Sequence, residues 1–241
     1  MKAPAISVVL PGLDEERVLP DALSSLRDQV DAPPFEVILA DGGSVDRTVA
    51  LFQEAISSWF ASWRSGVVVH CPRRGRAMQM NFGAARASGD ALLFLHADTR
   101  LPPGGLQAVA EALRDPHVVA GGFRHQFREP GVLLRVISFW ATARSLVRRI
   151  HYGDQAVFIR RSVFDGVGGF PEIPLFEDHG LAKRVKRAGR VITLTLAAET
   201  SARRLLQGGV LRTGIQFAWL RLRHALRADP EALRRDYPDV R

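Results

Sequence analysis

The sequence has a single cysteine, Cys71, and no run of about eighteen uninterrupted apolar residues. One cysteine excludes an intramolecular disulfide and favours a reducing compartment. The missing apolar run predicts that no helix crosses a membrane. The chain reaches Asp14 and Glu15 too early to leave room for the apolar region of a secretory signal. We therefore expect a cytoplasmic protein.

The sequence also lacks a Gly/Ser-rich or Pro-rich linker, an internal repeat and a low-complexity segment, so we expect one domain. The dinucleotide fingerprint G-x-G-x-x-G is absent after the first apolar run, and the phosphate loop G-x-x-x-x-G-K-[ST] is absent as well. These absences argue against a dehydrogenase and against a P-loop enzyme. Basic and aromatic residues do not alternate in repeats, which argues against a nucleic-acid partner.

Positive charge is plentiful, and it gathers toward the carboxyl terminus. The chain has a net charge of +8, and residues 203–241 hold nine arginines against four acids. Such a balance suits an anionic partner such as a nucleotide or a phospholipid surface. An apolar helix predicted at 132–150 also carries arginines, and either burial or a position on a membrane surface would explain it.

Unbroken apolar runs alternate with helical patterns in the first hundred residues. Such runs are typical of parallel strands buried on both faces, so we predict an α/β fold with a doubly wound, mainly parallel sheet. The predicted strands are 5–10, 35–40, 66–70 and 91–95, and the predicted helices are 18–26, 49–63 and 75–88.

The pattern beyond residue 100 is less regular. We predict helices at 106–113, 132–150, 174–188 and 211–226, and strands at 118–127, 156–159 and 191–196. A Gly-rich turn region is expected at 163–170. Gly121 and Gly122 lie inside a predicted strand, where missing side chains would let the backbone approach a ligand, although a simple bulge explains them equally well.

The run from Ala91 to Leu95 ends in His96 and Asp98. Ligands of open α/β sheets gather beyond the carboxyl ends of the strands. Residues at i and i+2 point the same way there, so the imidazole and the carboxylate can converge on one ligand. A metal ion bound to phosphate oxygens is the ligand that we expect. The alternative is that Asp98 only caps a helix beginning near Pro102.

Four acidic clusters lie where loops or helix starts are predicted. They are Asp14-Glu15-Glu16, Asp41, Asp98 and Glu177-Asp178. Each alone is typical of a helix cap or a solvated charge. In this order they resemble the inverting glycosyltransferases of family 2, which have the single-domain nucleotide-binding fold called GT-A.

The resemblance extends from Ile6 to about Arg204. Its motifs are Val9-Leu10-Pro11 with Asp14-Glu15; Asp41-Gly42-Gly43-Ser44 with Asp46 and Thr48; His96-Ala97-Asp98, where His replaces the first Asp of the Asp-x-Asp metal motif; and Glu177-Asp178. A narrower likeness is to the bacterial radical-SAM/selenodomain-associated transferases. It rests on Gly75-Arg76-Ala77-x-Gln79-Met80-Asn81, His96-Ala97-Asp98-Thr99, Tyr152-Gly153-Asp154-Gln155 and Ser201-Ala202-Arg203-Arg204.

The resemblance implies a nucleotide-sugar donor, with a uridine nucleotide favoured, and an unidentified hydroxyl-bearing acceptor that is either a small molecule or lipid-like. It implies Mg²⁺ or Mn²⁺ on the donor diphosphate, held by Asp98, with His96 either a further ligand or, when protonated, a contact to phosphate. Asp178 would be the catalytic base, and Glu177 would orient the loop or cap the helix. The implied donor-binding residues are Pro11, Asp14, Glu15, Asp41, Gly43, Arg76, Asn81, Ala97 and Asp98. The implied acceptor or sugar contacts are Gly122, Tyr152, Asp154, Gln155 and Glu177.

These implications divide the chain. Residues 1–204 would form the GT-A domain, with a nucleotide-binding half at 1–100 and an acceptor and catalytic half at 101–204. Residues 205–241 would be a basic, amphipathic helical extension. Two other readings stay open: a nucleotidyltransferase of similar fold, and a non-catalytic module that binds a membrane surface. A peripheral position on the inner face of a membrane is compatible with the enzyme as well. The Gln-x-x-Arg-Trp motif of processive members is missing, which argues against a polysaccharide synthase.

Overall fold

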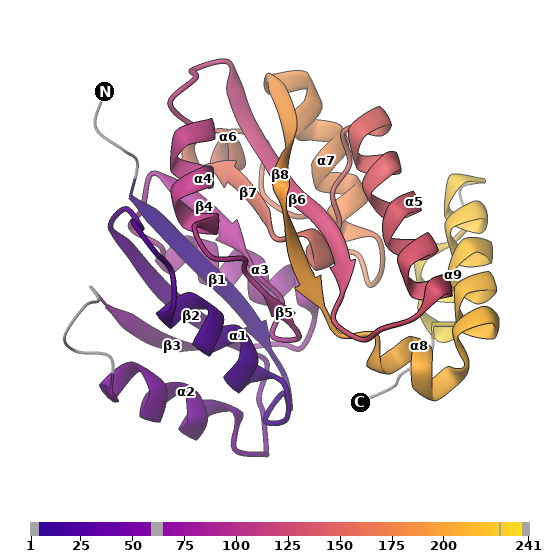
Figure 1. The fold of residues 1–241 in the computed structure, drawn as a ribbon, viewed down its shortest axis with the longest axis horizontal. Helices are drawn as coiled ribbons and strands as arrows, with labels where there is room; N and C mark the ends of the chain where they lie inside the picture. The colour runs from indigo at the N-terminus through magenta and orange to yellow at the C-terminus, as the bar shows by residue number, and fades with distance from the viewer. Residues whose placement is uncertain (1–4, 59–64, 227, 238–241) are drawn as a thin grey trace.

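The computed structural model describes residues 5–58, 65–226 and 228–237. In these ranges eight strands form one sheet in the order β3-β2-β1-β4-β7-β6-β8-β5, and helices cover both of its faces (Figure 1). The strands are β1 (Ile6–Gly12), β2 (Phe35–Asp41), β3 (Gly66–His70), β4 (Ala91–Phe94), β5 (Thr99–Arg100), β6 (Val118–Phe127), β7 (Val157–Arg160) and β8 (Arg190–Thr200). The helices are α1 (Leu19–Arg27), α2 (Thr48–Ser58), α3 (Arg76–Arg86), α4 (Gly105–Ala112), α5 (Val132–Arg148), the 3₁₀ helix η1 (Gly153–Gln155), α6 (Arg161–Gly166), α7 (Glu177–Ala188), α8 (Arg203–Gly208), α9 (Val210–Ala225) and α10 (Pro230–Arg235).

The amino-terminal half is a parallel, doubly wound sheet, as the apolar runs predicted. β1 lies between β2 and β4 and is parallel to both, and β3 is parallel to β2. Alternate residues of β1 face opposite layers: Val8 lies in one buried cluster with Leu23 of α1, and Val9 lies in the other with Met80 of α3. Because both faces are buried, nearly every position of such a strand is apolar; Ser7 is the polar exception in β1.

The second half of the sheet is mixed. β7 is antiparallel to both β4 and β6, and β5 is antiparallel to β8, whereas β6 and β8 are parallel. Four of the seven pairings are therefore parallel, which confirms the mainly parallel sheet. The direction changes at β4, the strand that leads to His96 and Asp98.

Several short elements differ from the prediction. The segment 163–170 is half helix, because Phe164 and its neighbours pack into the core as part of α6; the turn itself is confined to Gly168 and Gly169, with φ of 74° and 64°. β8 continues to Thr200, because it pairs there with the two-residue strand β5, which was not predicted. α2 is described as far as Ser58, so the rest of the predicted helix, up to residue 63, lies outside the described residues.

The carboxyl-terminal helices pack on the body of the molecule through buried leucines. Leu205 of α8 lies in a cluster with Leu134 of α5, and Leu220 of α9 lies in another with Leu233 of α10. α5 and α9 consequently run side by side (Figure 1). Within the described ranges, none of the helices has both the length and the apolar character needed to span a membrane.

Candidate active site

The loops that follow β1 and β2 are joined into one surface by hydrogen bonds. Asp14 has a positive φ of 54°. Its N–H donates to Ser44 Oγ at 3.1 Å, and its Oδ1 accepts from the Val45 N–H at 2.8 Å. The Glu15 N–H donates to Thr48 Oγ1 at 2.7 Å. Backbone N–H groups that would otherwise donate to water thus donate within the loops. These hydrogen bonds hold the backbone at Glu15 in place.

Asp41 is buried at the end of β2 and shapes the turn that follows. Its carboxylate accepts hydrogen bonds from the N–H groups of Gly43 and Ser44, both at 3.1 Å, and lies 3.3 Å from Nδ1 of His70. Burial alone would raise the pKa of Asp41, but these hydrogen bonds outweigh burial and lower the pKa below its ordinary value. Gly43 has φ of 89° and open space before it, so the turn remains accessible.

Gln79 is a supporting residue to which sequence analysis gave no role. It is buried on α3, and its Nε2 donates to the carbonyl oxygens of Gly12 at 2.6 Å and Ala40 at 3.0 Å. A Cβ on Gly42 would lie 2.9 Å from the same Nε2. Gln79 therefore holds the ends of β1 and β2 together. A polar residue on the apolar face of the predicted helix was the signal that could have revealed it.

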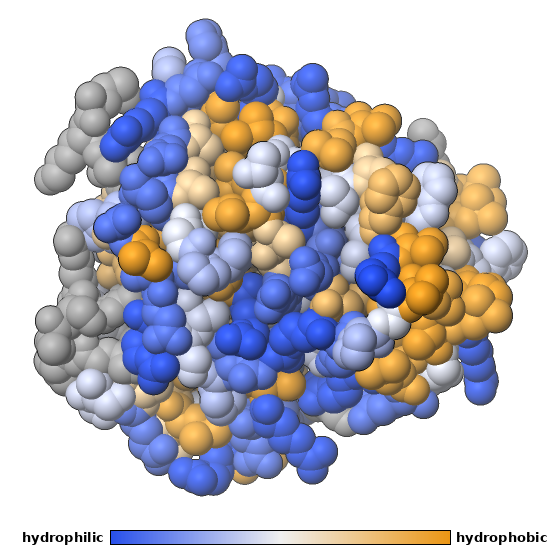
Figure 2. Space-filling model, viewed as in Figure 1, coloured by the Kyte–Doolittle hydropathy of each residue, from blue (hydrophilic) through white to orange (hydrophobic). Residues whose placement is uncertain are grey.

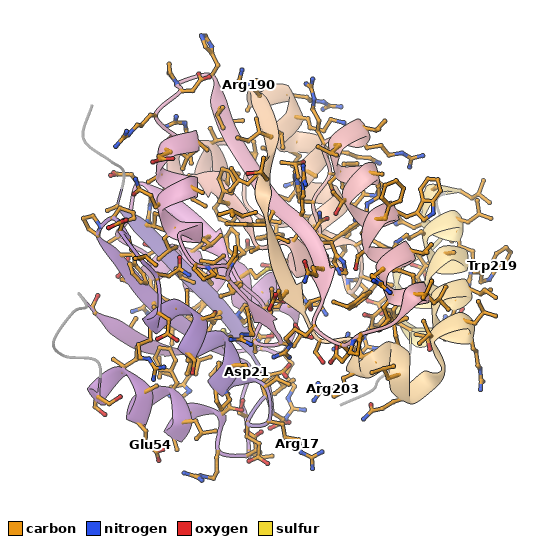
Figure 3. The ribbon with its side chains drawn as sticks, in the orientation of Figure 1. Arg17, Asp21, Glu54, Arg190, Arg203 and Trp219 are labelled. Carbon is orange, nitrogen blue, oxygen red and sulfur yellow. The ribbon has the colours of Figure 1, made fainter. Side chains whose placement is uncertain are left out.

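Charges of both signs gather where β1, β4 and α8 meet. Burial and the negative charge of Asp98 raise the pKa of Glu15 to about 7, and the charges of Arg203, Arg204 and Arg76 oppose that rise. Arg203 Nη2 lies 4.0 Å from Glu15 Oε2. Figure 3 shows Arg203 where α8 begins, below the sheet. Two carboxylates and three guanidinium groups thus act on one another in one region.

His96 points into the protein rather than into solvent. A Cβ on Gly153 would lie 2.0 Å from its Cε1 and Nε2, so the ring packs directly against that glycine. Nε2 is buried and has no hydrogen-bond partner in the described structure. Burial, together with the charge of Arg76, lowers the pKa of His96 to about 4. The lowered pKa favours the neutral ring, and the role of His96 toward a metal ion or a phosphate stays a prediction.

Arg76 connects the start of α3 to the start of α7. Its Nη1 lies 3.5 Å from Oε1 of Glu177, which is 3% exposed. Burial alone would lower the pKa of Arg76, but the carboxylates of Glu177, Asp178 and Asp98 raise it above its ordinary value. Arg76 is therefore charged at every accessible pH. Its guanidinium group lies between the acidic residues of α7 and Asp98.

Asp178 is buried in the first turn of α7, and its Oδ2 accepts a hydrogen bond from the Gly153 N–H at 3.1 Å. It borders an apolar cavity whose lining includes Ala120, Ile159 and Leu181. Burial, followed by the charge of Glu177, raises the pKa of Asp178 to about 8. A carboxylate with a raised pKa beside a site is the usual arrangement for a general base.

The segment after α5 contributes two of its predicted residues to the site. Tyr152 has the guanidinium carbon of Arg144 over its ring at 4.3 Å, and burial raises its pKa. Asp154 Oδ2 lies 3.5 Å from Nε2 of His125, whereas its Oδ1 is buried without a partner in the described structure. Burial alone would raise the pKa of Asp154, but the charges of His125, Arg144 and Arg221 outweigh it and lower the pKa.

Three predicted site residues are committed to packing instead. Gln155 is fully buried: its Oε1 accepts from Ser145 Oγ at 2.9 Å, and its Nε2 donates to the Phe123 carbonyl at 3.0 Å. The space before Gly122 is filled by His151, whose ring would lie 2.6 Å from an added Cβ. Asn81 donates to the Phe170 carbonyl and accepts from the Phe170 N–H, both at 2.9 Å. These contacts serve the fold, and any contact of the three residues with a substrate stays a prediction.

Two further predicted residues reach the site only through their backbone. Pro11 pairs with Ala40 near the end of β1, and its ring carries no polar group. The side chain of Ala97 is buried in the core between His96 and Asp98. In the described ranges, no group of three or more His, Cys, Asp or Glu side chains is placed to hold a metal ion. A metal here would need ligands from a bound molecule as well.

Known structures share this architecture. A mannosyltransferase from Pyrobaculum calidifontis, solved with GDP-Man and Mn²⁺, is 21% identical with a TM-score of 0.67; the similarity covers 83% of this chain and 57% of that one. TarS from S. aureus in complex with UDP is 20% identical with a TM-score of 0.66 and covers 83% and 60% of the two chains. These similarities identify the fold as GT-A.

Sequence relatives lead to the same family. A PGL/p-HBAD biosynthesis glycosyltransferase from Mycobacterium bovis is 32% identical over 180 residues, which are 70% of this chain and 64% of that protein. A dolichol-phosphate mannosyltransferase from Pyrococcus furiosus is 26% identical over 68% of this chain and 45% of its own length. The chain thus spans less than two thirds of these relatives. The family model "Glycosyl transferase family 2" matches residues 7–170. The chain belongs to glycosyl transferase family 2.

Proposed function

We propose that this protein is an inverting glycosyltransferase that moves a sugar from a nucleotide-sugar donor to a hydroxyl-bearing acceptor, with Asp178 as the base. The observation that supports this most is the position of Asp178, which is buried in the first turn of α7, next to the Arg76–Glu177 pair, in a chain of this family. A nucleotidyltransferase is a weaker interpretation, because the chain directly after β1 reaches Asp14 and Glu15 where such enzymes usually have a Gly-rich loop with a basic residue. The likeness to the radical-SAM/selenodomain-associated transferases stays a prediction.

In the proposed reaction the acceptor hydroxyl oxygen forms a bond to the anomeric carbon of the sugar while its proton passes to the Asp178 carboxylate. The bond from the anomeric carbon to the diphosphate breaks, and its electron pair leaves with the diphosphate oxygen. Attack from the face opposite the leaving group inverts the configuration. Arg76 and Arg203 would offset the negative charge that develops on the diphosphate.

We propose that the donor lies along the loops after β1, β2 and β4, with a uridine nucleotide favoured. Asp41 and the open turn at Gly43 would face the base, and Asp14 or Glu15 would face the base or ribose. Asp98 would hold Mg²⁺ or Mn²⁺, a cation that neutralises charge on a leaving diphosphate when bound. The site suits a hard cation, because like charge from Asp98 contributes to the raised pKa of Glu15, and a divalent ion would relieve that repulsion.

Calorimetric titration with UDP, GDP, CDP and dTDP tests the donor site. We expect one of them to bind in the presence of Mn²⁺, and we expect affinity to fall at least about tenfold with a chelator or in Asp98→Asn. Asp165→Asn is the matched control, because that carboxylate is exposed on α6, where it pairs with Arg161. Failure of all four nucleotides to bind the wild type would refute the donor site. Equal binding by Asp98→Asn would refute the role of Asp98.

We further propose that α5 and α9 meet an anionic membrane surface, which would suit a lipid-like acceptor. Their outer sides expose large apolar residues, among them Phe139 and Trp140, both 66% exposed, and Trp219, 56% exposed. Trp219 projects away from the body of the molecule (Figure 3), and apolar side chains gather over these two helices (Figure 2). Arg135, which is exposed on α5, adds positive charge that anionic lipid attracts.

Sedimentation with vesicles of phosphatidylglycerol and phosphatidylcholine tests this surface. We expect binding at low salt that weakens at high salt and in the double variant Trp140→Ser/Trp219→Ser. Val45→Ser is the control, because Val45 is 87% exposed on the opposite part of the sheet, in the loop after β2. No binding to anionic vesicles, or dimerisation in ultracentrifugation that needs the same tryptophans, would refute a membrane face.

A further inference from the structure

A second cluster of positive charge lies where α5, η1 and α9 meet, outside the donor loops. The guanidinium carbons of Arg144 on α5 and Arg221 on α9 lie over the ring of Tyr152, at 4.3 and 5.5 Å from its centre. A tyrosine ring attracts cations through its face. Three separate segments of the chain thus place two guanidinium groups around one aromatic side chain.

The positive charges of this cluster are only partly balanced by the protein, because Asp154 acts on both guanidinium groups without forming an ion pair with either. Neither Arg144 nor Arg221 forms an ion pair with a carboxylate among the described residues. The neighbouring carboxylate, Asp154, lies against His125 instead. Burial and then the charge of Arg221 lower the pKa of Arg144, as expected for two cations held close together.

Two buried polar atoms in the same cluster have no hydrogen-bond partner in the described structure: Nε of Arg144, a donor, and Oδ1 of Asp154, an acceptor. Buried polar atoms without partners are rare, and each calls for an explanation such as a bound molecule. The donor would suit an anionic oxygen, and the acceptor would suit a hydroxyl. Together they indicate a ligand that carries both kinds of group.

The cluster adjoins the candidate base. Tyr152 directly precedes Gly153, whose N–H donates to Asp178, and the charge of Asp178 contributes to the raised pKa of Tyr152. A base that takes a proton from an acceptor hydroxyl must lie beside that acceptor. The side chains that surround Tyr152 are therefore neighbours of the acceptor.

We propose that Arg144 and Arg221 bind a phosphate group carried by the acceptor, which places the acceptor hydroxyl beside Asp178. This inference rests on the proposed function. A carboxylate has two oxygens and is satisfied by one guanidinium fork, whereas a phosphate ester has three free oxygens and about two negative charges, which matches two arginines. The phosphate belongs either to a soluble ester or to a lipid headgroup.

Binding of methyl phosphate and of vesicles containing phosphatidic acid tests the proposal, with methanol and phosphatidylcholine vesicles as uncharged controls. Each probe is added to the full chain with and without saturating nucleoside diphosphate and Mn²⁺. Arg221→Gln is the main variant, because this side chain is exposed and its loss should leave the fold intact. Arg212→Gln is the matched control, an exposed arginine on the same helix without an ion pair in the described structure.

We expect Arg221→Gln to weaken phosphate binding about tenfold or more, and we expect Arg212→Gln to leave it unchanged. Asp154→Asn should tighten phosphate binding, because it removes a negative charge from the cluster. If Arg221 and Asp154 only stabilised the fold, both substitutions would be expected to weaken binding. Preference for methyl phosphate would identify a soluble acceptor, and preference for phosphatidic acid would identify a lipid.

Equal binding of phosphate by wild type and Arg221→Gln, or no binding by the wild type, would overturn the proposal. The nucleotide titration separates this failure from failure of the proposed function. If nucleoside diphosphate binds and phosphate does not, only the acceptor inference is lost. If phosphate binds through Arg221 while no nucleotide binds, the anion site stands and the proposed transfer reaction falls.

Discussion

Replacement of Asp178 by Asn is the sharpest test of the proposed chemistry. The amide keeps the shape of the carboxylate, and its oxygen can still accept the hydrogen bond from the Gly153 N–H, which is 3.1 Å long in the wild type. Only the ability to take a proton is lost. General-base catalysis contributes roughly 10² to 10⁴ in rate, so turnover should fall by that factor. Release of nucleoside diphosphate from a nucleotide sugar measures it, with water as acceptor where no other is known.

The same substitution should stabilise the fold in alkaline solution. Burial raises the pKa of Asp178 from 3.8 to about 8, so the folded protein holds a proton that the unfolded chain releases. Wild-type stability should therefore fall between about pH 4 and pH 8, by a few kcal/mol at about 1.4 kcal/mol per pKa unit. Asp178→Asn removes this dependence, so its gain in melting temperature should be larger at pH 8 than at pH 5. Asp165→Asn, which alters an exposed carboxylate, should show no such trend.

Two results would refute this reasoning. Nucleotide affinity that falls as far as turnover would mean that Asp178 supports the donor site instead of acting as the base. If wild type and Asp178→Asn showed the same dependence of stability on pH, Asp178 would be ionised in the folded protein. Its pKa would then not be raised by burial.

Gly153→Ala should destabilise the protein by several kcal/mol, because the new methyl carbon would lie 2.0 Å from the ring of His96. Gly166→Ala, at a helical position with open space, should raise or preserve the melting temperature; equal losses in both variants would contradict this account. Tyr237→Phe should tighten nucleoside diphosphate binding several-fold, because the Tyr237 hydroxyl accepts a hydrogen bond from Arg204 at 2.9 Å and so competes with phosphate for that guanidinium. Calorimetry on the variant checks this, and weaker binding would mean that the contact instead prepares Arg204 for the donor.

The parallel half of the sheet could be predicted because burial on both faces leaves an unmistakable pattern. β1, β2 and β4 are largely apolar, and each is followed within a few residues by an acidic side chain. The carboxyl ends of parallel strands meet at one edge, so the sequence alone was enough to expect Glu15, Asp41 and Asp98 in the same region.

Some short elements could not be predicted, because they have neither an apolar run nor a complete periodic pattern. β5 and α8 illustrate the consequence. β5 is held by its pairing with β8, and α8 brings Arg203 to Glu15 from a distant part of the chain. Neither contact can be predicted from the local sequence, since each depends on the position of another segment. The motif that contains Arg203 could be recognised, but its contact with Glu15 could not be predicted.

Residues inside a recognised motif can be structural, and the sequence does not separate the two kinds. Tyr152, Asp154 and Gln155 lie within four positions of one another. Gln155 is fully buried and hydrogen-bonded to Ser145 and Phe123. The ring of Tyr152 and the carboxylate of Asp154 instead belong to the charged cluster. Backbone direction decides this, because η1 turns each successive side chain to a different side. Only the three-dimensional path of the segment reveals which residue faces the substrate.

That path also explains how the proposed base and the proposed acceptor site are positioned together. Gly153 donates its N–H to Asp178, and Gln155, two residues later, accepts from Arg144 at 3.2 Å. One rigid turn therefore fixes both the carboxylate that would take the proton and the guanidinium that would hold the acceptor phosphate. Because the turn is anchored in the core through Gln155, neither group can shift without the other. A variant that loosens Gln155 should consequently impair phosphate binding and turnover together, whereas Arg221→Gln, at the exposed end of the cluster, should weaken phosphate binding and leave the pH dependence set by Asp178 unchanged.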